Sequence, residues 1–567
     1  MKLQPADNAY KLAVRTAAVA GVFSLIVCAL LLFEYSRRPA KDPGESPALM
    51  DLREEINTQP DNEKLRKVYR SLDQQLRQEY FFQRAFTTAG AWLLLGGASV
   101  FLISASWAAT LRRKLPKPEP RTTQIDREEA TTQVGRWAVA GLSLLLVATV
   151  VTLSITMSKT LPPAGPPLPE SPADAKELAK AWPRFRGPGG LGISAFADLP
   201  TSWDGESGKN ILWKTVVPLP GKNSPVVCRG RVFLSGADEK RRKVFCFDAE
   251  DGKLLWQREV PGTPQSMRTP LEIEFAGFAA PTTVTDGYRV FAIFANGDIA
   301  ALDYAGKVVW SRSLGIPDND YGHASSLTMF ENRVLVQFDQ GTKKDDKSKF
   351  LALDADTGKT VWEMPRAVPA SWTSPIVVES AGRKQVISAT SPWVFSYDPV
   401  DGTELWRAKC LSQDVGPSPT FRTGTVYVAN AYPCLSAIGA DGSGDVTETH
   451  VKWTGEDGMP DTACPLVTDK YVLLLASYGV LTCYSTNDGK MLWEEDFDTQ
   501  FASSPSLVGD RVYIFGEEGD AWVVEPGDEG CKRISEAKLG EDCVTSPAFQ
   551  KGRIYIRGKK HLFCIGQ

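Results

Sequence analysis

The chain has 567 residues, with 64 Lys and Arg against 68 Asp and Glu and a net charge of −4. This length is enough for two to four domains with sizeable cores, and the balanced charge argues against a partner of the nucleic-acid class. Only three histidines occur, far apart in sequence, and no Cys-x-x-Cys pair is present. The sequence therefore argues against a His-rich metal site, a zinc ribbon or a haem attachment site.

Three apolar segments dominate the first third of the chain. Residues 16–33, 86–111 and 137–157 are each long enough to cross a bilayer as a helix. The first segment could instead be a signal peptide, but no small-x-small cleavage site follows it, and we expect a retained anchor. Residues 1–159 are therefore expected to form an all-α membrane region of three transmembrane helices, in contact with the lipid bilayer.

Flanking charge predicts the orientation of these helices. Residues 112–136 carry seven Lys and Arg, whereas residues 158–175 carry only Lys159. Because positively charged loops stay in the cytoplasm, residues 112–136 should be a cytoplasmic loop and the chain after residue 158 should be exported. The predicted location is the bacterial cytoplasmic (inner) membrane, as a multi-pass protein with a periplasmic C-terminal domain.

Two connecting segments have patterns of their own. Residues 44–85 carry apolar side chains at helical spacing, which predicts an exported helical hairpin that packs on itself or serves as a sensing or oligomerising module. Residues 160–181 hold six prolines between positions 162 and 172, which favours an extended, semi-rigid linker.

Beyond residue 182 one motif recurs. FDAEDGKLLW (247–256), LDADTGKTVW (353–362), YDPVDGTELW (397–406) and YSTNDGKMLW (484–493) share a Gly-containing turn followed by tryptophan. The tryptophans of the full and looser copies lie 40 to 54 residues apart, at Trp213, Trp256, Trp310, Trp362, Trp406, Trp453 and Trp493. A period of this size is typical of a solenoid or a propeller.

Each copy of the motif is preceded by the same order of signals. A Ser-Pro or a variant of it opens one strand, a β-branched run such as RVLVQF (333–338) forms a second, and the motif supplies a third and a fourth. Units of three strands begin near residues 224, 280, 325, 374, 418, 464, 504 and 546.

The last unit of three strands has no fourth strand after it, and the strand around Trp213 precedes the first unit and belongs to none. Pairing the two closes a ring without an open sheet edge. The sequence thus predicts an all-β eight-bladed propeller over residues 182–567, with four-stranded antiparallel blades and an N-terminal strand that closes the last blade.

This fold explains a motif that superficially suggests ligand binding. LDADTGKTVW resembles the end of a phosphate-binding loop and the start of a calcium loop. However, Leu353 stands where the first needs glycine, and Pro365 stands where the second needs glutamate. We interpret the motif as a hairpin turn, and we expect the seven tryptophans to dock neighbouring blades.

The cysteines divide into two groups. The first group occupies core positions of the repeat and comprises Cys246, Cys464, Cys483 and Cys564. The second group lies in or near loops or is undecided, and comprises Cys228, Cys410, Cys434, Cys531 and Cys543. Export would permit a disulfide within the second group, whose connectivity the sequence does not give.

One face of the propeller is a candidate interaction face. The connections from each fourth strand to the next blade are long, and they share a face with the loops between second and third strands. This face is predicted to hold Tyr321, His323, Trp372, Trp393 and Tyr432. Aromatic side chains on irregular loops are typical of a binding surface, although the same residues could instead plug the central channel and pack the loops.

The repeat signature, together with WPRFRGPGGLGIS (182–194), resembles the pyrroloquinoline-quinone (PQQ)-type β-propeller family. This resemblance implies one of two functional classes. Quinoprotein dehydrogenases bind PQQ and calcium at the propeller axis, whereas members similar to the propeller lipoprotein of the outer-membrane β-barrel assembly machine lack the cofactor and act as scaffolds. The chain has no Cys-Cys pair and no recognisable set of calcium ligands, so it is nearer the second class.

The resulting expectation is a scaffold without cofactor, metal or catalytic residues, whose partners are other envelope or membrane proteins. Two alternatives stay open at this point. One is a membrane-bound PQQ-dependent dehydrogenase, and the other is an extracytoplasmic sensor.

Overall fold

The computed structural model describes residues 5–36, 96–109, 168–263, 276–431 and 434–566. The chain divides into two compact units, Met1–Leu153 and Ser154–Gln567. The predicted hairpin 44–85, the loop 112–136 and the apolar segment 137–157 lie outside the described residues.

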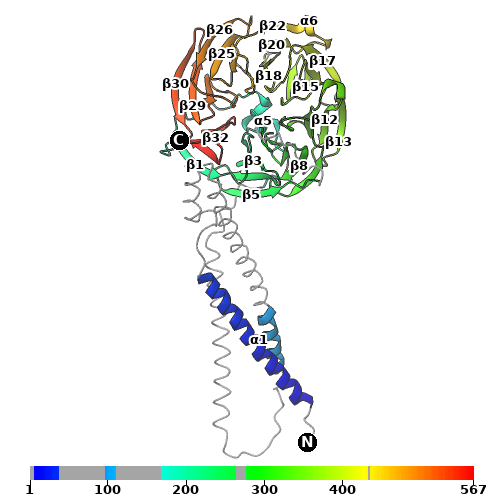
Figure 1. The fold of residues 1–567 in the computed structure, drawn as a ribbon, viewed down its shortest axis with the longest axis vertical. Coiled ribbons are helices and arrows are strands. Elements are labelled where there is room, and N and C mark those ends of the chain that lie inside the picture. The colour runs from blue at the N-terminus through cyan, green and yellow to red at the C-terminus, as the bar shows by residue number, and fades with distance from the viewer. Residues whose placement is uncertain (1–4, 37–95, 110–167, 264–275, 432–433, 567) are drawn as a thin grey trace, which may run out of the picture. The chain divides into compact units, whose positions relative to one another are not determined.

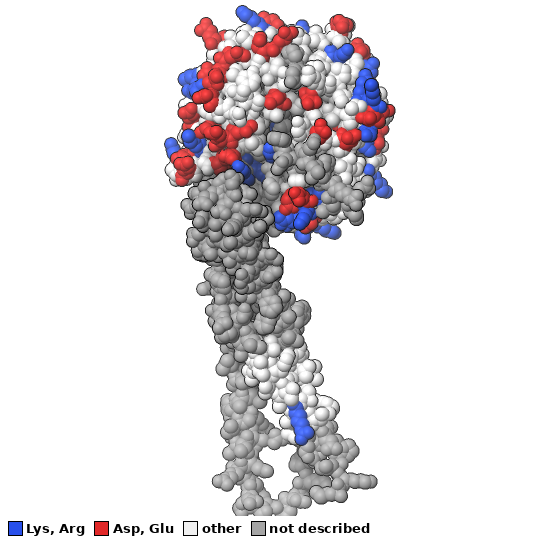
Figure 2. All heavy atoms as spheres, in the orientation of Figure 1, with Lys and Arg blue, Asp and Glu red and all other residues white. Residues whose placement is uncertain are grey.

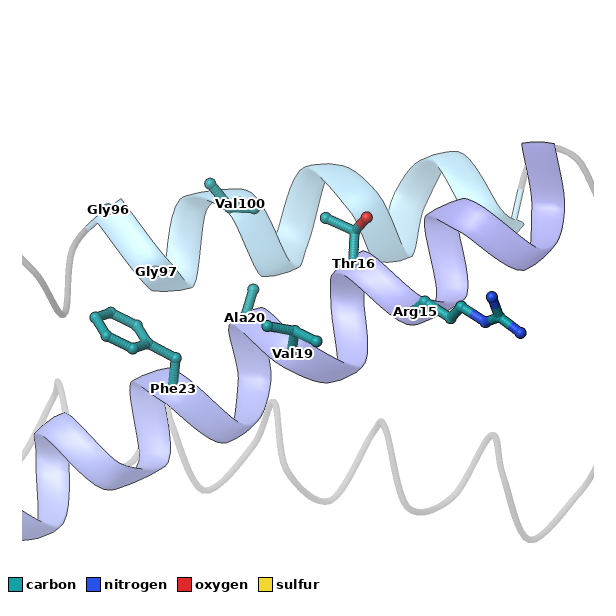
Figure 3. Close-up of a pocket in the computed structure, with 8 residues that line it drawn as sticks. All are labelled: Arg15, Thr16, Val19, Ala20, Phe23, Gly96, Gly97 and Val100. Carbon is teal, nitrogen blue, oxygen red and sulfur yellow. The ribbon is translucent and has the colours of Figure 1, made fainter. Parts of the chain in front are cut away.

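In the N-terminal unit, α1 (Pro5–Ser36) contains the first predicted span, and residues 96–109 of the second are also helical. The two helices approach each other at small residues, since a Cβ on Gly97 would lie 2.5 Å from Ser24 Oγ and 3.1 Å from the Phe23 ring. Beside this crossing lies a hollow of ≈ 610 Å³, into which Phe23 points from α1 (Figure 3).

Among the described residues, no helix is long and apolar enough to cross a membrane. The expectation of three transmembrane helices is therefore not supported, and the predicted location as a multi-pass protein of the cytoplasmic membrane is wrong by this criterion.

The C-terminal unit consists of eight sheets around a common axis (Figure 1). The strands of the first four blades, from the axis outward, are β2 (Val226–Cys228), β3 (Arg231–Ala237), β4 (Arg242–Asp248) and β5 (Leu254–Glu259); β6 (Val284–Thr285), β7 (Arg289–Ile293), β8 (Asp298–Asp303) and β9 (Val308–Ser313); β10 (Thr328–Phe330), β11 (Arg333–Phe338), β12 (Ser348–Asp354) and β13 (Thr360–Arg366); and β14 (Ile376–Ser380), β15 (Arg383–Ala389), β16 (Trp393–Tyr397) and β17 (Glu404–Lys409).

The other four blades follow the same order. Their strands are β18 (Thr420–Arg422), β19 (Thr425–Asn430), β20 (Cys434–Gly439) and β22 (Val451–Gly455); β23 (Leu466–Val467), β24 (Tyr471–Leu475), β25 (Val480–Ser485) and β26 (Met491–Asp496); β27 (Ser506–Val508), β28 (Arg511–Phe515), β29 (Asp520–Pro526) and β30 (Cys531–Lys538); and β31 (Ala548–Gln550), β32 (Arg553–Arg557), β33 (His561–Gly566) and β1 (Ile211–Val216).

The ring closes as predicted. β1 pairs antiparallel with β33, and Trp213 lies opposite Cys564, so the N-terminal strand completes the eighth blade. Figure 1 shows the C-terminus beside β1. The eight blades of four antiparallel strands are confirmed. One sheet carries an addition, because β21 (Gly444–Asp445) pairs parallel with the outer edge of β17. The helix α6 (Thr447–His450) follows β21.

The repeated motif forms the turn between third and fourth strands. In blade three, Asp354 Oδ1 accepts a hydrogen bond from Thr357 N at 2.8 Å, and Gly358 adopts a φ of +67° that favours glycine. The Trp310 indole of blade two lies against this glycine and donates from Nε1 to Ala355 O at 2.9 Å. The motif thus builds a turn and at the same time provides the seat for the tryptophan of the preceding blade.

Six of the seven tryptophans donate to a backbone carbonyl in the neighbouring blade; the donors are Trp213, Trp256, Trp310, Trp362, Trp453 and Trp493. Trp406 differs, because it donates to the side-chain oxygen of Gln385 in its own blade.

The cysteines all carry free thiols, and all ten lie within the described residues. The four predicted core cysteines are buried, as are Cys228 and Cys543. Cys410, Cys434 and Cys531 are half-buried.

The segment before β1 crosses the propeller axis. Trp182 pairs with Val227 in the innermost strand of blade one, and Ile193 pairs with Leu507 in the innermost strand of blade seven. The predicted linker 160–181 is not a spacer throughout its described part, because α5 (Ala175–Lys180) is anchored to blade one. Both carboxylate oxygens of Glu177 accept hydrogen bonds from Arg229, each at 2.7 Å.

Surface charge is distributed unevenly around the ring. In Figure 2, Asp and Glu gather over the left side of the propeller, where Figure 1 places β25, β26, β29 and β30. Residues 494–542 hold fourteen Asp and Glu against four Lys and Arg. The small net charge of the chain therefore conceals a strongly acidic side of the propeller.

Candidate interaction site on the loop face

The long connections between blades and the loops between second and third strands meet on one face, which we call the loop face. Antiparallel order places both kinds of segment at the same end of the strands. Hydrogen bonds link them: Ser477 Oγ donates to Asp461 Oδ2 at 2.9 Å, and Glu517 N donates to Gln500 O at 2.8 Å. In blades six and seven, the connection and the loop are thus joined on the loop face.

Two of the predicted aromatic residues form a pair on this face. The rings of Tyr321 and Trp372 pack edge to face, with centroids 5.2 Å apart. Tyr321 is 40% exposed, and Trp372 is half-buried. Trp372 Nε1 donates to Asn319 Oδ1 at 2.9 Å, so the pair joins the connection before blade three to the connection before blade four.

A buried polar network fixes the backbone on both sides of Trp372. Gln337 Nε2 donates to Ser371 Oγ at 2.9 Å and to Thr373 Oγ1 at 3.0 Å, which are the two neighbours of Trp372 in sequence. Ser371 Oγ in turn donates to Asp339 Oδ2 at 2.7 Å. Since both flanking residues are fixed, the Trp372 side chain is presented from a rigid backbone.

An ion pair completes this network. Arg366 Nη1 lies 3.3 Å from Asp339 Oδ1, and both side chains are almost fully buried. Burial raises the pKa of Asp339, and the Arg366 guanidinium partly opposes that rise. Arg366 also donates to Ser388 Oγ, which donates to Gln337 Oε1. These hydrogen bonds and the ion pair link side chains of blades three and four, so the network rigidifies the seam between the two blades.

His323 does not lie on the surface that the sequence assigned to it. Its side chain is buried, stacked on Phe338 at 5.3 Å between ring centroids, and its backbone N–H donates to Ala295 O. Burial lowers the pKa of His323 to about 4, so the imidazole is neutral near pH 7. His323 therefore supports the loops rather than contacting a partner.

The remaining predicted residues lie apart from the pair. Trp393 is half-buried and packs in the seam of blades three and four, with Arg407 Cζ 4.9 Å from its ring centroid. Tyr432 lies outside the described residues. The structure thus brings together Tyr321 and Trp372, and it assigns His323 and Trp393 to packing.

The residues do not fit the calcium ion that quinoprotein dehydrogenases carry. Within the described ranges, no three Asp, Glu, His or Cys side chains come close enough to hold a metal ion. Calcium in proteins needs six to eight oxygen ligands, several of them from carboxylates. Asp354, which the sequence offered as the start of a calcium loop, is instead occupied by its own turn.

Comparison with solved structures shows the fold. A quinohemoprotein alcohol dehydrogenase from Pseudomonas putida HK5 aligns with a TM-score of 0.51 at 12% identity, covering 70% of this chain and 82% of that chain.

Comparison with protein sequences identifies relatives. The outer membrane protein assembly factor BamB of Moranella endobia is 24% identical over 286 residues, which is 47% of this chain and 70% of the relative. BamB of Yersinia pestis is 22% identical over 363 residues, which is 59% of this chain and 83% of the relative. The family model described as outer membrane protein assembly factor BamB matches residues 194–341, 346–463 and 445–530, more than half of the chain. The chain therefore belongs to the BamB family of PQQ-like β-propellers.

Proposed function

We propose that this protein is a non-catalytic scaffold that binds envelope proteins during their assembly. Membership of the BamB family, named for outer-membrane protein assembly, supports this proposal. The binding site is the pair formed by the exposed Tyr321 and the half-buried Trp372 on the loop face.

The observation that carries the site is the rigid support of Trp372. Exposed aromatic side chains contribute most to binding when they lose little conformational freedom in the complex. The hydrogen bonds of Ser371 and Thr373 to Gln337 fix the backbone on both sides of the indole before a partner arrives. Such preorganisation is typical of an anchor in a protein–protein interface.

Site-specific photo-crosslinking in cells tests the proposal. A photoreactive residue at position 321 of the full-length chain should yield a cross-link to an envelope-assembly protein, identified by mass spectrometry. The same residue at Val309, which is 44% exposed on β9, is the control and should yield none of this product. Trp372→Ala should reduce the product at least fivefold.

Two results would contradict the proposal. One is cross-linking from position 321 that does not exceed the level at position 309. The other is dye-linked oxidation of an alcohol or sugar by the purified protein after addition of PQQ and Ca²⁺, which would make the protein an enzyme.

A further inference from the structure

Two arginines are buried at the propeller axis, and among the described residues no charged side chain accepts a hydrogen bond from either of them. Arg184 and Arg186 belong to the segment that crosses the axis and are 6% and 1% exposed. Arg184 donates to Thr328 Oγ1 and, at 2.6 Å, to Pro375 O. Arg186 donates to the carbonyl oxygens of Leu191 and Pro465. All four acceptors are uncharged.

These contacts leave several guanidinium donors unused. Arg184 Nε, Arg186 Nε and Arg186 Nη1 are buried and have no hydrogen-bond partner among the described residues. Desolvation lowers the pKa of Arg184 to about 9 and also lowers that of Arg186. Burying a charged group without a counter-charge is strongly unfavourable, and Arg184 and Arg186 place three unused donors in one short segment, where a negatively charged acceptor would be stabilised.

A circle of small polar side chains surrounds the propeller axis. One side chain from each blade accepts a hydrogen bond from the backbone N–H of the blade before it, at 2.8 to 3.3 Å, in a closed circle. We call this circle the axial ring; its members are Ser224, Thr282, Ser326, Ser374, Ser418, Cys464, Ser504 and Ser546.

The axial ring and the arginines lie next to each other. Pro375 and Pro465, whose carbonyl oxygens accept from Arg184 and Arg186, directly follow Ser374 and Cys464 of the ring. Each ring side chain accepts through its oxygen or sulfur and retains a hydrogen that it can donate. The axis therefore combines two positive charges with hydroxyl donors.

Glycines keep the two guanidinium groups in place. A Cβ on Gly190 would lie 3.2 Å from Arg184 Cζ, and a Cβ on Gly192 would lie 2.7 Å from Arg186 Nη2. Both glycines also adopt positive φ angles, +77° and +74°. The absence of a side chain at Gly190 and Gly192 thus lets the guanidinium groups of Arg184 and Arg186 pack directly against the backbone.

We propose that the propeller axis binds one small anion, a carboxylate or an oxyanion such as phosphate, held by Arg184, Arg186 and hydroxyls of the axial ring. The anion supplies the missing acceptor for the unused guanidinium donors. This site is separate from the loop face and does not depend on the scaffold function. Because Arg184 and Arg186 contact blades three, four and six, anion binding also ties these blades to the crossing segment.

Isothermal titration calorimetry of the purified full-length chain tests this site directly. The probes are inorganic phosphate, acetate and chloride, each at constant ionic strength. We expect saturable binding of at least one probe with a stoichiometry of one per chain. Arg184→Met and Arg186→Met should each weaken the affinity at least tenfold.

Arg557→Met is the matched control. Arg557 is equally buried, and its Nη1 and Nη2 donate to Asn223 Oδ1, Ser235 O and Leu219 O at the seam of blades eight and one. Like Arg184, it has uncharged acceptors and an Nε without a hydrogen-bond partner among the described residues, but it lies away from the crossing segment. This variant should bind the anion within twofold of the wild type, even if it unfolds more easily. Equal weakening by Arg557→Met would show that the loss is due to general destabilisation, and would overturn the proposal.

A second measurement covers variants that do not fold. The unfolding temperature of the wild type should rise with the concentration of the bound anion, because a ligand of the folded state stabilises it by mass action. Arg186→Lys, which keeps the charge but loses the planar fork, should reduce this rise at least twofold. No saturable binding and no rise with any of the three probes would overturn the proposal, and would indicate that water alone occupies the axis.

Discussion

Replacing Trp406 by alanine should be the most damaging of the seven tryptophan truncations. Trp406 is completely buried, whereas Trp310 is half-buried. Trp406 Nε1 donates at 2.8 Å to Gln385 Oε1, and that oxygen also accepts a hydrogen bond from Ser396 Oγ at 2.7 Å. The Trp406 indole thus fills the core and also donates a hydrogen bond to the buried side-chain oxygen of Gln385.

The magnitude follows from these two contributions. Truncating a fully buried tryptophan costs about 3–5 kcal/mol through lost burial and the remaining cavity. The lost hydrogen bond adds about 1 kcal/mol at most, because Gln385 Oε1 keeps Ser396 as a donor. Trp406→Ala should therefore lower the free energy of unfolding by about 3–6 kcal/mol. Trp310→Ala leaves a gap that opens to solvent, and about 2–3 kcal/mol is expected.

Urea-induced unfolding of the full-length protein measures this difference, with the transition midpoint and slope compared between variants. Trp406→Phe retains most of the ring volume while removing the Nε1 donor, and should cost about 1–2 kcal/mol. If Trp406→Ala and Trp310→Ala lower the stability equally, the assignment of Trp406 to a fully enclosed position is refuted.

Two further predictions concern single buried groups. Because burial lowers the pKa of His323 to about 4 from 6.5, only the unfolded chain binds this proton between those values, and stability should fall by about 3 kcal/mol as the pH falls from 6.5 to 4. His323→Gln should flatten that part of a profile of unfolding free energy against pH, and an unchanged profile would contradict the assignment. In the axial ring, Ser418 N donates to Cys464 Sγ at 3.3 Å. Cys464→Ser should strengthen this bond and raise the stability by about 0.5–1 kcal/mol, seen as a higher thermal midpoint; a lower midpoint would show that the ring needs the larger sulfur.

The propeller could be predicted in detail because its signals are local and repeated. A turn such as Asp354 to Gly358 depends on residues within five positions, and the same turn chemistry recurs around the ring. Counting the copies gives the number of blades. The unpaired strand at Trp213 then gives the closure, since a propeller leaves no sheet edge open.

The interior of the candidate site could not be predicted, because its contacts are distant in sequence. After Arg333, Gln337 is the one polar residue in the run RVLVQF, and that irregularity is the signal that could have drawn attention to it. Apart from Asp339, however, its partners lie 34 to 52 residues away in the next connection and the next blade. No pattern of spacing specifies that Ser371 and Thr373 turn inward while Trp372 turns outward.

The sequence left open whether His323 contacts a partner or packs the loops, and its burial could not be predicted for a related reason. A histidine in a long connection is expected at the surface, because loops are usually exposed. Here the connection folds back over Phe338, and the ring stacking buries the imidazole. The apolar segments near the N-terminus were interpreted as membrane spans from composition alone, and no helix among the described residues is long and apolar enough for one.

The pairing of β1 with β33 makes the start and the end of the propeller neighbours in one sheet. Residues 211–216 run alongside residues 561–566, so the ring of hydrogen bonds is complete although the covalent chain is not. The point in blade eight where the propeller chain starts and ends is therefore not fixed by the architecture of the ring. A circularly permuted chain, cut in another hairpin turn and joined across blade eight, would retain the same eight sheets in the same order.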